Sequence, residues 1–261
     1  SSVDSCVVAN GIPKSGTYLI HKIIEWLARW KNLNIHISAT HWDDVKDAKN
    51  QKINICPSAL SVKKLRNGQF VAAHLPFNKR LEKVMKIVNS NRRIKHVFIY
   101  RDPRDTFVSY MNFVTYSDKY FDERGGKRDQ QFLQTNFSND DDRLAYVIDR
   151  RKKSRYFLPY APWLNSSFCH PVKFEDLFVE INKAASGTLG PILSNLIKYL
   201  EIDPDSIDPV NLYHSVYNKG RTASKEKNKI GQYKNYFKEK HYALIDNSEF
   251  KEILQIFGYQ H

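Results

Sequence analysis

The segment Cys6-Val7-Val8-Ala9-Asn10-Gly11-Ile12-Pro13-Lys14-Ser15-Gly16-Thr17 decides the fold. Its first five residues form a short, mostly apolar run that is typical of a buried strand. A turn with glycines and a proline follows, and from Thr17 to about Trp30 apolar side chains recur at the spacing of one helical face. The segment therefore predicts a strand, a glycine loop and a helix in succession.

The same order of strand and helix recurs downstream. Because strands alternate with helices, we predict a parallel sheet covered by helices on both faces. We expect a single α/β domain over residues 1–261. Further strands are predicted at 70–74, 96–100 and 169–174, helices at about 78–88, 105–116 (capped by Asp102), 140–158 and 189–200, a mobile surface loop at 117–139 and a flexible basic loop at 218–232.

The composition is that of a basic globular protein. The chain has 261 residues, a net charge of +13 and 41% hydrophobic residues, enough to bury a core, which excludes global disorder. No apolar run approaches the roughly 18–20 residues that cross a bilayer, and no signal peptide is visible. The cysteines Cys6, Cys56 and Cys169 are widely spaced, which is typical of a reducing compartment, so we expect a cytoplasmic protein.

The glycine loop indicates which class of anionic ligand this basic protein binds. Charge alone does not choose among nucleic acid, an anionic surface and a phosphorylated small molecule. A helix N-terminus presents unpaired N–H groups, and Gly11 and Gly16 let the backbone curl around a phosphate. The Gly-x-x-x-x-Gly spacing matches a P-loop, but Thr17-Tyr18 replaces the lysine and hydroxyl residue of that motif. We predict a phosphate-bearing ligand without triphosphate hydrolysis; an ordinary strand-to-helix turn is the alternative.

Two further candidate sites lie where predicted strands end, which is where open α/β sheets bind ligands. His74 ends the second predicted strand and could take a proton from a hydroxyl or amine, or be a structural histidine bonded to a backbone carbonyl. Arg101 follows the third strand, and Ser109 lies about two turns into the next helix, so both could hold a second phosphate. The alternatives are an Arg101–Asp105 ion pair and a serine that faces its own helix. Two anion sites indicate a nucleotide phosphorylated at both ends.

These motifs resemble the sulfotransferase superfamily that uses 3′-phosphoadenosine 5′-phosphosulfate (PAPS), nearest its cytosolic-type branch. The family's phosphosulfate loop Pro-Lys-Ser-Gly-Thr is intact at residues 13–17, and residues 74–76 match the end of its Lys-Thr-His-Leu-Pro motif. Residues 100–109 match its 3′-phosphate motif, 173–177 resemble its Tyr-Glu-Asp segment, and 231–237 resemble the end of its C-terminal motif. The matches keep the family's order over most of the chain.

The resemblance implies the P-loop-containing nucleotide-binding architecture of that family, with a central parallel sheet flanked by helices in a single domain. It also implies transfer of a sulfuryl group from PAPS to a hydroxyl or amine of a small-molecule acceptor. The product would be 3′,5′-adenosine bisphosphate (PAP), and no metal would be needed. His74 would be the catalytic base, and Lys14 would stabilise the bridging oxygen as it leaves. The implied donor-binding residues are Pro13, Lys14, Ser15, Gly16, Thr17, Tyr18, Arg101, Ser109, Lys227, Asn228 and Lys229.

The chain departs from the family pattern near the loop and the base. Ala72 stands where a second lysine is expected, so one charge on the transferring group is missing. Leu19 replaces the tryptophan that would stack on adenine, and Phe174 replaces the tyrosine of the Tyr-Glu-Asp segment.

The C-terminal motif is also incomplete. Glu226-Lys227-Asn228 stands in place of Arg-Lys-Gly, which leaves Lys227 as the surviving cation, with Arg221 or Lys229 as a candidate replacement for the arginine. The dimerisation motif of the cytosolic branch is not recognisable after Lys234, so the resemblance implies no oligomeric state.

The sequence gives less information about the acceptor substrate than about the donor. Aromatic side chains could wall an aromatic or polycyclic acceptor, although aromatics at such spacings more often belong to a core. Residues 41–44 could form an acceptor-side loop in which Asp43 or Asp44 pairs with a cationic substrate, with a helix cap as the alternative. The candidate wall comprises Tyr110, Phe113, Tyr116, Tyr120, Phe121, Tyr156, Phe157, Tyr160 and Trp163.

Two other classes of function are alternatives to a sulfotransferase. A nucleotide kinase or other P-loop phosphotransferase would need the missing Gly-Lys-Ser/Thr lysine. A basic nucleic-acid-binding protein is favoured by charge alone, because the sequence holds no RNA- or DNA-binding motif. We therefore expect no nucleic-acid partner and no membrane span.

Overall fold

The computed structural model describes two compact units and confirms the α/β class. Unit 1 comprises Ser1–Tyr100 and Tyr160–Asn228, and unit 2 comprises Arg101–Pro159 and Lys229–His261. A single domain over 1–261 stays a prediction. The described residues are 4–38, 45–46, 52–53, 62, 64–79, 81–83, 85, 93–116, 126–152, 154–218 and 230–260.

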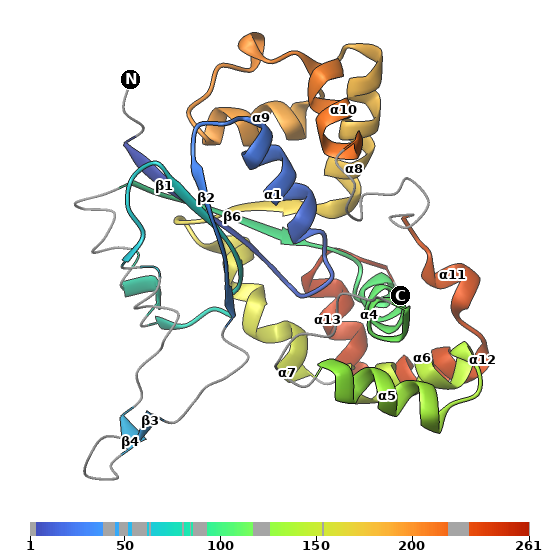
Figure 1. Cartoon of the computed structure of the whole chain (residues 1–261). Helices are drawn as coiled ribbons and strands as arrows, with labels where there is room; N and C mark the ends of the chain where they lie inside the picture. The colour runs from blue at the N-terminus through green and yellow to red at the C-terminus, as the bar shows by residue number, and fades with distance from the viewer. Residues whose placement is uncertain are drawn as a thin grey trace. The chain divides into compact units, whose positions relative to one another are not determined.

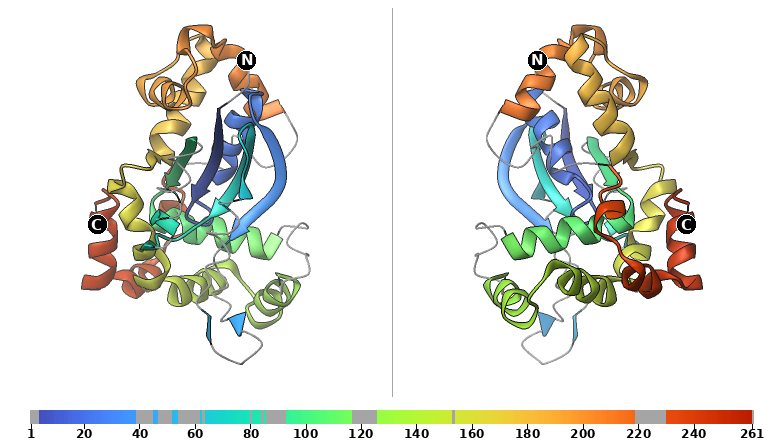
Figure 2. Two further views of the ribbon diagram at one scale, coloured as in Figure 1. Left: turned by 90° about the vertical axis from the view of Figure 1, so that its left-hand side faces the viewer. Right: turned by 90° about the vertical axis from the view of Figure 1, so that its right-hand side faces the viewer.

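Unit 1 contains a five-stranded parallel sheet (Figure 1). Its strands are β1 (Ser5–Gly11), β2 (Lys31–Ser38), β5 (Gln69–His74), β6 (Arg93–Tyr100) and β7 (His170–Lys173), in the order β2-β5-β1-β6-β7. Figure 2 shows β2, β5 and β1 side by side. In the register, Asn10 of β1 lies opposite Ala73 of β5, and Gly11 lies opposite Ile99 of β6. The carboxyl ends of these parallel strands therefore meet at one end of the sheet.

Four of these strands confirm predictions, and β2 was not predicted. The chain enters β2 after α1 (Thr17–Trp26), which is shorter than the predicted helix. Ala28 adopts a left-handed backbone with φ 52°, and that turn ends the helical path before Trp30. A separate two-stranded antiparallel pair is formed by β3 (Val45–Lys46) and β4 (Lys52–Ile53).

The helices of unit 1 share one apolar core with the sheet. They are α1, α8 (Phe174–Lys183), α9 (Pro191–Tyr199) and α10 (Pro209–Asn218), with 3-10 turns η2 (Ala184–Ser186) and η3 (Pro204–Ser206). The predicted helix at 189–200 is confirmed as α9. Burial of these side chains is the main stabilisation of the unit. The core includes Val7, Ile20, Ile23, Phe70, Val97, Leu177, Leu196 and Leu212.

Unit 2 is helical in its described residues. Helix α4 has the predicted cap, because Asp102 Oδ1 accepts a hydrogen bond from the Arg104 N–H at 2.9 Å, and it begins at Pro103, two residues before the predicted start. The predicted helix at 140–158 is present as α6 and α7. The elements are α4 (Pro103–Tyr116), α5 (Gly126–Asn136), α6 (Asp140–Arg151), α7 (Ser154–Phe157), α11 (Tyr233–Tyr236), α12 (Glu239–Ile245) and α13 (Ser248–Ile256), and η1 (Leu158–Asn165) crosses the boundary between the units.

One predicted loop was wrong. Within the segment expected to be a mobile loop at 117–139, residues 126–136 form α5. Gln130 and Gln134 donate side-chain hydrogen bonds to Thr115 O at 3.2 and 2.9 Å, so α5 is held at the C-terminal end of α4 by polar contacts that hydrophobic periodicity does not reveal. Most of the predicted basic loop at 218–232 lies outside the described residues. No described helix has the length and apolar character that a membrane span requires.

Candidate functional site

The loop between β1 and α1 is held in its curl by Ser15. The buried Ser15 hydroxyl lies 2.6 Å from Ile12 O and 2.9 Å from Ile99 O, and the Ser15 N–H donates to Ile12 O at 3.0 Å. These contacts close the loop on itself and fasten it to the end of β6. The Ser15 side chain, expected to bind the donor, therefore holds the shape of the loop in this structure.

Glycine is required at both ends of the loop for steric reasons. Gly16 has φ +100°, and a Cβ there would lie 2.4 Å from Cδ2 of Phe174. A Cβ on Gly11 would lie 2.6 Å from Thr17 Oγ1 and 2.9 Å from Ile99 O. The backbone at Gly11 and Gly16 therefore packs where any side chain would collide. Such close backbone approach is what allows N–H groups to converge on an anion.

The N-terminus of α1 fits an anion. Thr17 Oγ1 is buried and has no hydrogen-bond partner among the described residues. In α1 the Leu19 N–H already donates to Gly16 O at 2.8 Å, and the first turn contains no acidic residue. The N–H groups before Leu19 lack an intrahelical acceptor, as at the start of any helix. Lys14 is half-buried in the same loop, in a left-handed backbone with φ 70°. Phosphate or sulfate oxygens would satisfy the Thr17 hydroxyl and these N–H groups together.

The imidazole of His74 is bonded to the same loop. Its Nδ1 lies 2.7 Å from Gly11 O. A carbonyl oxygen only accepts, so Nδ1 carries the hydrogen, and in the neutral ring Nε2 carries the lone pair. The bond to a backbone carbonyl was the structural alternative for this residue, and it also leaves Nε2 as the nitrogen that can take up a proton.

Asn10 is a buried polar residue of this strand end that motif reasoning did not single out as functional. Its Oδ1 accepts from the N–H groups of Leu75 at 2.7 Å and Gly11 at 2.9 Å, and its Nδ2 donates to Leu75 O at 3.0 Å. The only sequence signal is an asparagine at the end of an apolar run. A buried amide with all of these bonds joins the end of β1 to the residue after His74.

In unit 2, Arg101 belongs to a buried ion-pair network. Arg101 Nη2 lies 3.2 Å from Asp105 Oδ2, and both side chains are almost fully buried. Asp105 also accepts from the N–H groups of Gly231 at 2.8 Å and Tyr233 at 2.9 Å. Burial raises the pKa of Asp105, against the opposing effects of the Arg101 charge and the two N–H donors. The ion pair named as the alternative for Arg101 is therefore present.

A second ion pair lies beside the first. Arg104 pairs with Asp102 at 2.7 Å, and its guanidinium carbon lies 4.2 Å from the centroid of the Tyr233 ring. The N-terminus of α4 is thus tied to residues 231–233, the start of the segment that resembles the family's C-terminal motif. Ser109 lies half-buried farther along α4. Lys227, Asn228 and Lys229 lie outside the described residues, as does Arg221.

Two residues that depart from the family pattern near the loop are buried, one in the core and one against the loop. Leu19, in place of the adenine-stacking tryptophan, is buried in the core of unit 1. Phe174, in place of a tyrosine, provides the ring against which Gly16 packs. Tyr18 is half-buried, and its ring stacks on His21 with centroids 6.0 Å apart.

Much of the predicted aromatic wall belongs to the cores of the two units. In unit 2, Phe157 is fully buried and packs on Phe107 with centroids 5.7 Å apart. In unit 1, Trp163 is fully buried against Phe77 and His96. Tyr160 is buried as well. The core interpretation is therefore right for Phe157, Tyr160 and Trp163.

The remaining members of the wall have other surroundings. Tyr110 and Tyr156 flank the Arg151 guanidinium, whose carbon lies 3.3 and 4.6 Å from their ring centroids. Tyr116 is exposed, and Phe113 is half-buried. Tyr120, Phe121 and residues 41–44 lie outside the described residues.

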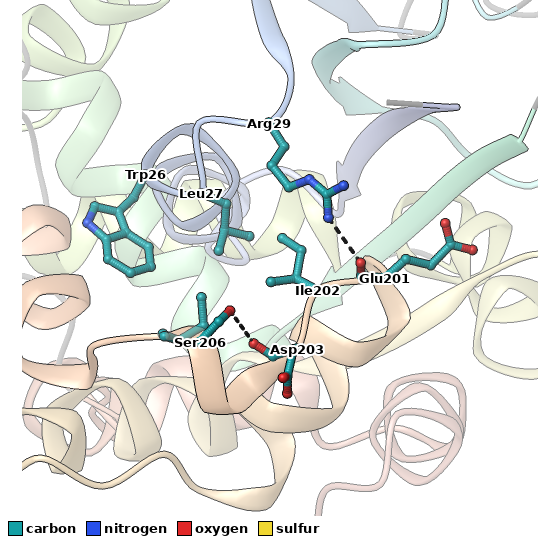
Figure 3. Close-up of a pocket in the computed structure, with 8 residues that line it drawn as sticks. Trp26, Leu27, Arg29, Glu201, Ile202, Asp203 and Ser206 are labelled. Carbon is teal, nitrogen blue, oxygen red and sulfur yellow. Dashed lines mark hydrogen bonds between the residues drawn. The ribbon is translucent and has the colours of Figure 1, made fainter. Parts of the chain in front are cut away.

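A hollow of about 370 Å³ lies at the opposite end of α1 from the loop (Figure 3). Apolar side chains such as Trp26 and Ile202 line it. Its polar side chains are bonded locally, since Arg29 donates to Glu201 O at 3.0 Å and Ser206 to Asp203 O at 2.6 Å. None of the predicted site residues lines this hollow.

Comparisons with known proteins identify the family of the chain. The family model described as a sulfotransferase domain matches residues 4–253. Mouse sulfotransferase SULT7A1, solved in complex with PAP, has 14% sequence identity and a TM-score of 0.53, covering 97% of this chain and 85% of that one. Retinol dehydratase, solved with androsterone and inactive cofactor PAP, has 14% identity and a TM-score of 0.47, covering 97% and 81%. No curated protein matches the chain.

Proposed function

This chain belongs to the sulfotransferase domain family, and we propose that it transfers a sulfuryl group from PAPS to a hydroxyl or amine of a small-molecule acceptor, with His74 as the general base. The observation that carries the proposal is the 2.7 Å contact between His74 Nδ1 and Gly11 O. That contact attaches a proton acceptor to the loop whose N–H groups and Thr17 hydroxyl fit an anion. The contact supports a base and an anion site held at the same end of the sheet, which is the arrangement that in-line group transfer needs.

The reaction needs a proton acceptor and charge stabilisation on the leaving side. The acceptor oxygen or nitrogen forms a bond to sulfur, the bond from sulfur to the bridging phosphate oxygen breaks, and its electron pair stays on that oxygen. His74 Nε2 takes the proton of the attacking hydroxyl or amine. The Lys14 ammonium, the N–H groups of α1 and the Thr17 hydroxyl offset the charge that develops on the leaving phosphate. These groups can act without a metal ion.

The second anion site would anchor the other end of the donor. We assign the 3′-phosphate to Arg101 and Ser109, with Lys227, Asn228 and Lys229 as additional contacts. A guanidinium has five N–H donors, so the bond to Asp105 is compatible with a bond to phosphate. The assignment rests on the motif at 100–109 and on the network that joins Arg101 to residues 231–233 through Asp105.

The proposal extends to the acceptor only by chemical class. An aromatic, polycyclic or cationic small molecule fits the family and the aromatic content of the chain, and we expect no nucleic-acid partner. A cytoplasmic location stays a prediction from the cysteines, of which Cys6 and Cys169 form no disulfide within the described residues.

Calorimetry with competing ligands tests the function. We expect PAP to bind tightly, while ATP with Mg²⁺ and an oligonucleotide bind weakly or not at all. A panel of phenols, alcohols and amines incubated with ³⁵S-labelled PAPS should yield a labelled product for at least one class. Binding of ATP with turnover, or of the oligonucleotide, in the absence of PAP binding would replace the proposal with one of the alternatives.

A further inference from the structure

We propose that Asn10 is a positioning residue: its side-chain amide clamps the backbone at Leu75 and so sets the orientation and tautomer of the His74 imidazole. The inference deepens the proposed function, since it rests on His74 acting as the base. It concerns a residue outside the donor-binding loop and the catalytic histidine.

The clamp consists of paired hydrogen bonds between one side chain and one backbone residue. Asn10 Oδ1 accepts from the Leu75 N–H at 2.7 Å, and Asn10 Nδ2 donates to Leu75 O at 3.0 Å. The backbone pairing of β1 with β5 extends to Asn10, which lies opposite Ala73. The amide therefore supplies, two residues beyond Ala73, the donor and acceptor that a neighbouring strand would otherwise present.

The same amide also holds the partner of the imidazole. Asn10 Oδ1 accepts from the Gly11 N–H at 2.9 Å, and Gly11 O is the atom that His74 Nδ1 meets at 2.7 Å. Leu75, clamped by Asn10, directly follows His74 in the chain. Asn10 thus fixes the backbone on both sides of the His74–Gly11 hydrogen bond.

Leu75 has little freedom to move away from this arrangement. Its carbonyl also accepts from Trp163 Nε1 at 2.8 Å, so both of its lone pairs have donors. Asn10 and Trp163 are fully buried, and water does not replace a bond lost here. Removal of the amide would leave the Leu75 and Gly11 N–H groups without their acceptor in a dry environment.

This geometry has a direct consequence for proton transfer. The bond to Gly11 O selects the tautomer with hydrogen on Nδ1 and the lone pair on Nε2. If the backbone at Gly11 and Leu75 shifts, the imidazole can also populate the tautomer with hydrogen on Nε2, which cannot take a proton there. A displacement of about 1 Å in a catalytic group can lower turnover about 100-fold.

Two substitutions separate the clamp from general stability. Asn10→Leu keeps the approximate size and removes every hydrogen bond, while Asn10→Asp keeps the oxygen that accepts from Leu75 and Gly11 and places a second oxygen against Leu75 O. The matched control is Asn182→Leu in α8, where an asparagine of unit 1 donates to Phe178 O at 2.8 Å. The readouts are ¹⁵N spectra of the histidine rings, with His74 assigned from His74→Ala, together with kcat, KM for PAPS and the PAP dissociation constant.

We expect a single Nδ1–H tautomer for His74 in the wild type and a mixture of tautomers in both Asn10 variants. We further expect kcat to fall about 10-fold to 100-fold with KM for PAPS and PAP affinity within about threefold. Asn182→Leu should match the wild type in the spectra and in kcat.

Unchanged His74 ring signals in the Asn10 variants overturn the proposal, whether or not kcat falls. If Asn10→Leu does not fold, Asn10→Asp decides by the same criterion. The spectra also separate this proposal from the proposed function. A wild-type protein that binds no PAP and consumes no PAPS refutes the function, whereas the tautomer comparison still decides the role of Asn10.

Discussion

The loop between β1 and α1 in unit 1 and the arginine network of unit 2 both lie where a strand gives way to a helix, yet they hold polar groups in different ways. In unit 1 the fixed groups are neutral and bonded to carbonyls, as His74 is to Gly11 O, and Thr17 Oγ1 has no partner among the described residues. In unit 2 the groups are buried ions with internal counterions, Arg101 with Asp105 and Arg104 with Asp102.

The difference indicates a division of roles. A loop with no carboxylate of its own, and with a buried hydroxyl that has no partner among the described residues, is suited to an external anion, and its dipoles would stabilise charge that develops during a reaction. A buried arginine that already has a carboxylate contributes to the structure, because removing either partner leaves an uncompensated charge. We therefore expect chemistry to depend on unit 1, and anchoring of the ligand and stability to depend on unit 2.

Substitution of His74 is the strongest test of this division. We expect His74→Ala to lower kcat by about two to four orders of magnitude, because general-base assistance is lost, with PAP affinity within about threefold of the wild type. Steady-state kinetics and calorimetry measure the two quantities. His214→Ala, at an exposed position of α10, is the control and should leave both unchanged. A His74→Ala enzyme with near wild-type turnover would move the base elsewhere.

Substitution of Arg101 should affect binding and stability together. We expect Arg101→Leu to lower the free energy of unfolding by about 3 kcal/mol, because Asp105 stays buried without its counterion. PAP should bind at least about 100-fold more weakly, while adenosine 5′-phosphosulfate, which lacks the 3′-phosphate, should bind about as well as to the wild type. Urea unfolding and calorimetry measure the effects. Lys22→Met, which removes the surface pair of Lys22 with Glu25, should cost under about 0.5 kcal/mol.

A double variant separates the two consequences of losing Arg101. Arg101→Leu/Asp105→Asn should be less destabilised than the sum of its single changes, because the buried carboxylate is also removed. PAP affinity should stay low in the double variant. Additive stability losses would show that the two side chains act independently, and the charge-pair account of unit 2 would be wrong.

Sequence reasoning succeeded where a local motif and an elementary rule agree. The apolar run before Gly11 predicted β1, Asp102 predicted the cap of α4, and the strand end at His74 predicted a residue beside the loop. It missed β2, where polar residues such as Asn32 and His36 interrupt the apolar pattern of Lys31–Ser38. It also missed α5, which buries Leu133 but is otherwise largely polar.

The parts of the site that could not be predicted depend on contacts between distant residues. The bond of Asn10 to Leu75 spans 65 positions, and that of Asp105 to Gly231 spans 126. Neither has a local pattern, because each becomes meaningful only once the strands are paired or the chain returns to α4. The aromatic wall was predicted from a local pattern that does not distinguish two outcomes, since an aromatic residue at a plausible spacing fills a core as readily as it lines a pocket.

Acid sensitivity should originate in unit 1, where a histidine is buried without charge. His96 is fully buried on β6, with its ring edge-on to Trp163 at 4.4 Å, and burial lowers its pKa from 6.5 to about 3. Between these values the unfolded chain binds a proton that the folded chain does not, so stability is lost as the pH falls below about 6.5. At pH 5 we expect a loss of about 2 kcal/mol relative to pH 7.

Urea unfolding of the wild type and of His96→Phe at both pH values measures this loss. The variant has no titrating ring at this position, so it should lose about 2 kcal/mol less than the wild type between pH 7 and pH 5. An equal loss in the two proteins would assign the acid sensitivity to other groups, including the ion pairs of unit 2.

The smallest expected effect concerns backbone strain. Among the described residues, the non-glycine positions with positive φ are Lys14 (70°), Ala28 (52°) and Glu201 (61°), all in unit 1. A left-handed backbone costs an L-residue about 1 kcal/mol relative to glycine, so Lys14→Gly should unfold with a free energy about 1 kcal/mol above that of Lys14→Ala. Both variants lack the ammonium and should be equally impaired in turnover.

Ala28→Gly is the matched control for this strain, because Ala28 lies at the far end of α1 from the loop. It should gain a similar stability and leave kcat unchanged. Equal unfolding free energies for Lys14→Gly and Lys14→Ala would mean that the backbone at residue 14 carries no strain. A Lys14→Gly protein that is more stable than Lys14→Ala but inactive would indicate that the backbone strain at residue 14 is tolerated because it places a cation in the loop. Unit 2, by contrast, holds its charged side chains in buried pairs of opposite charge.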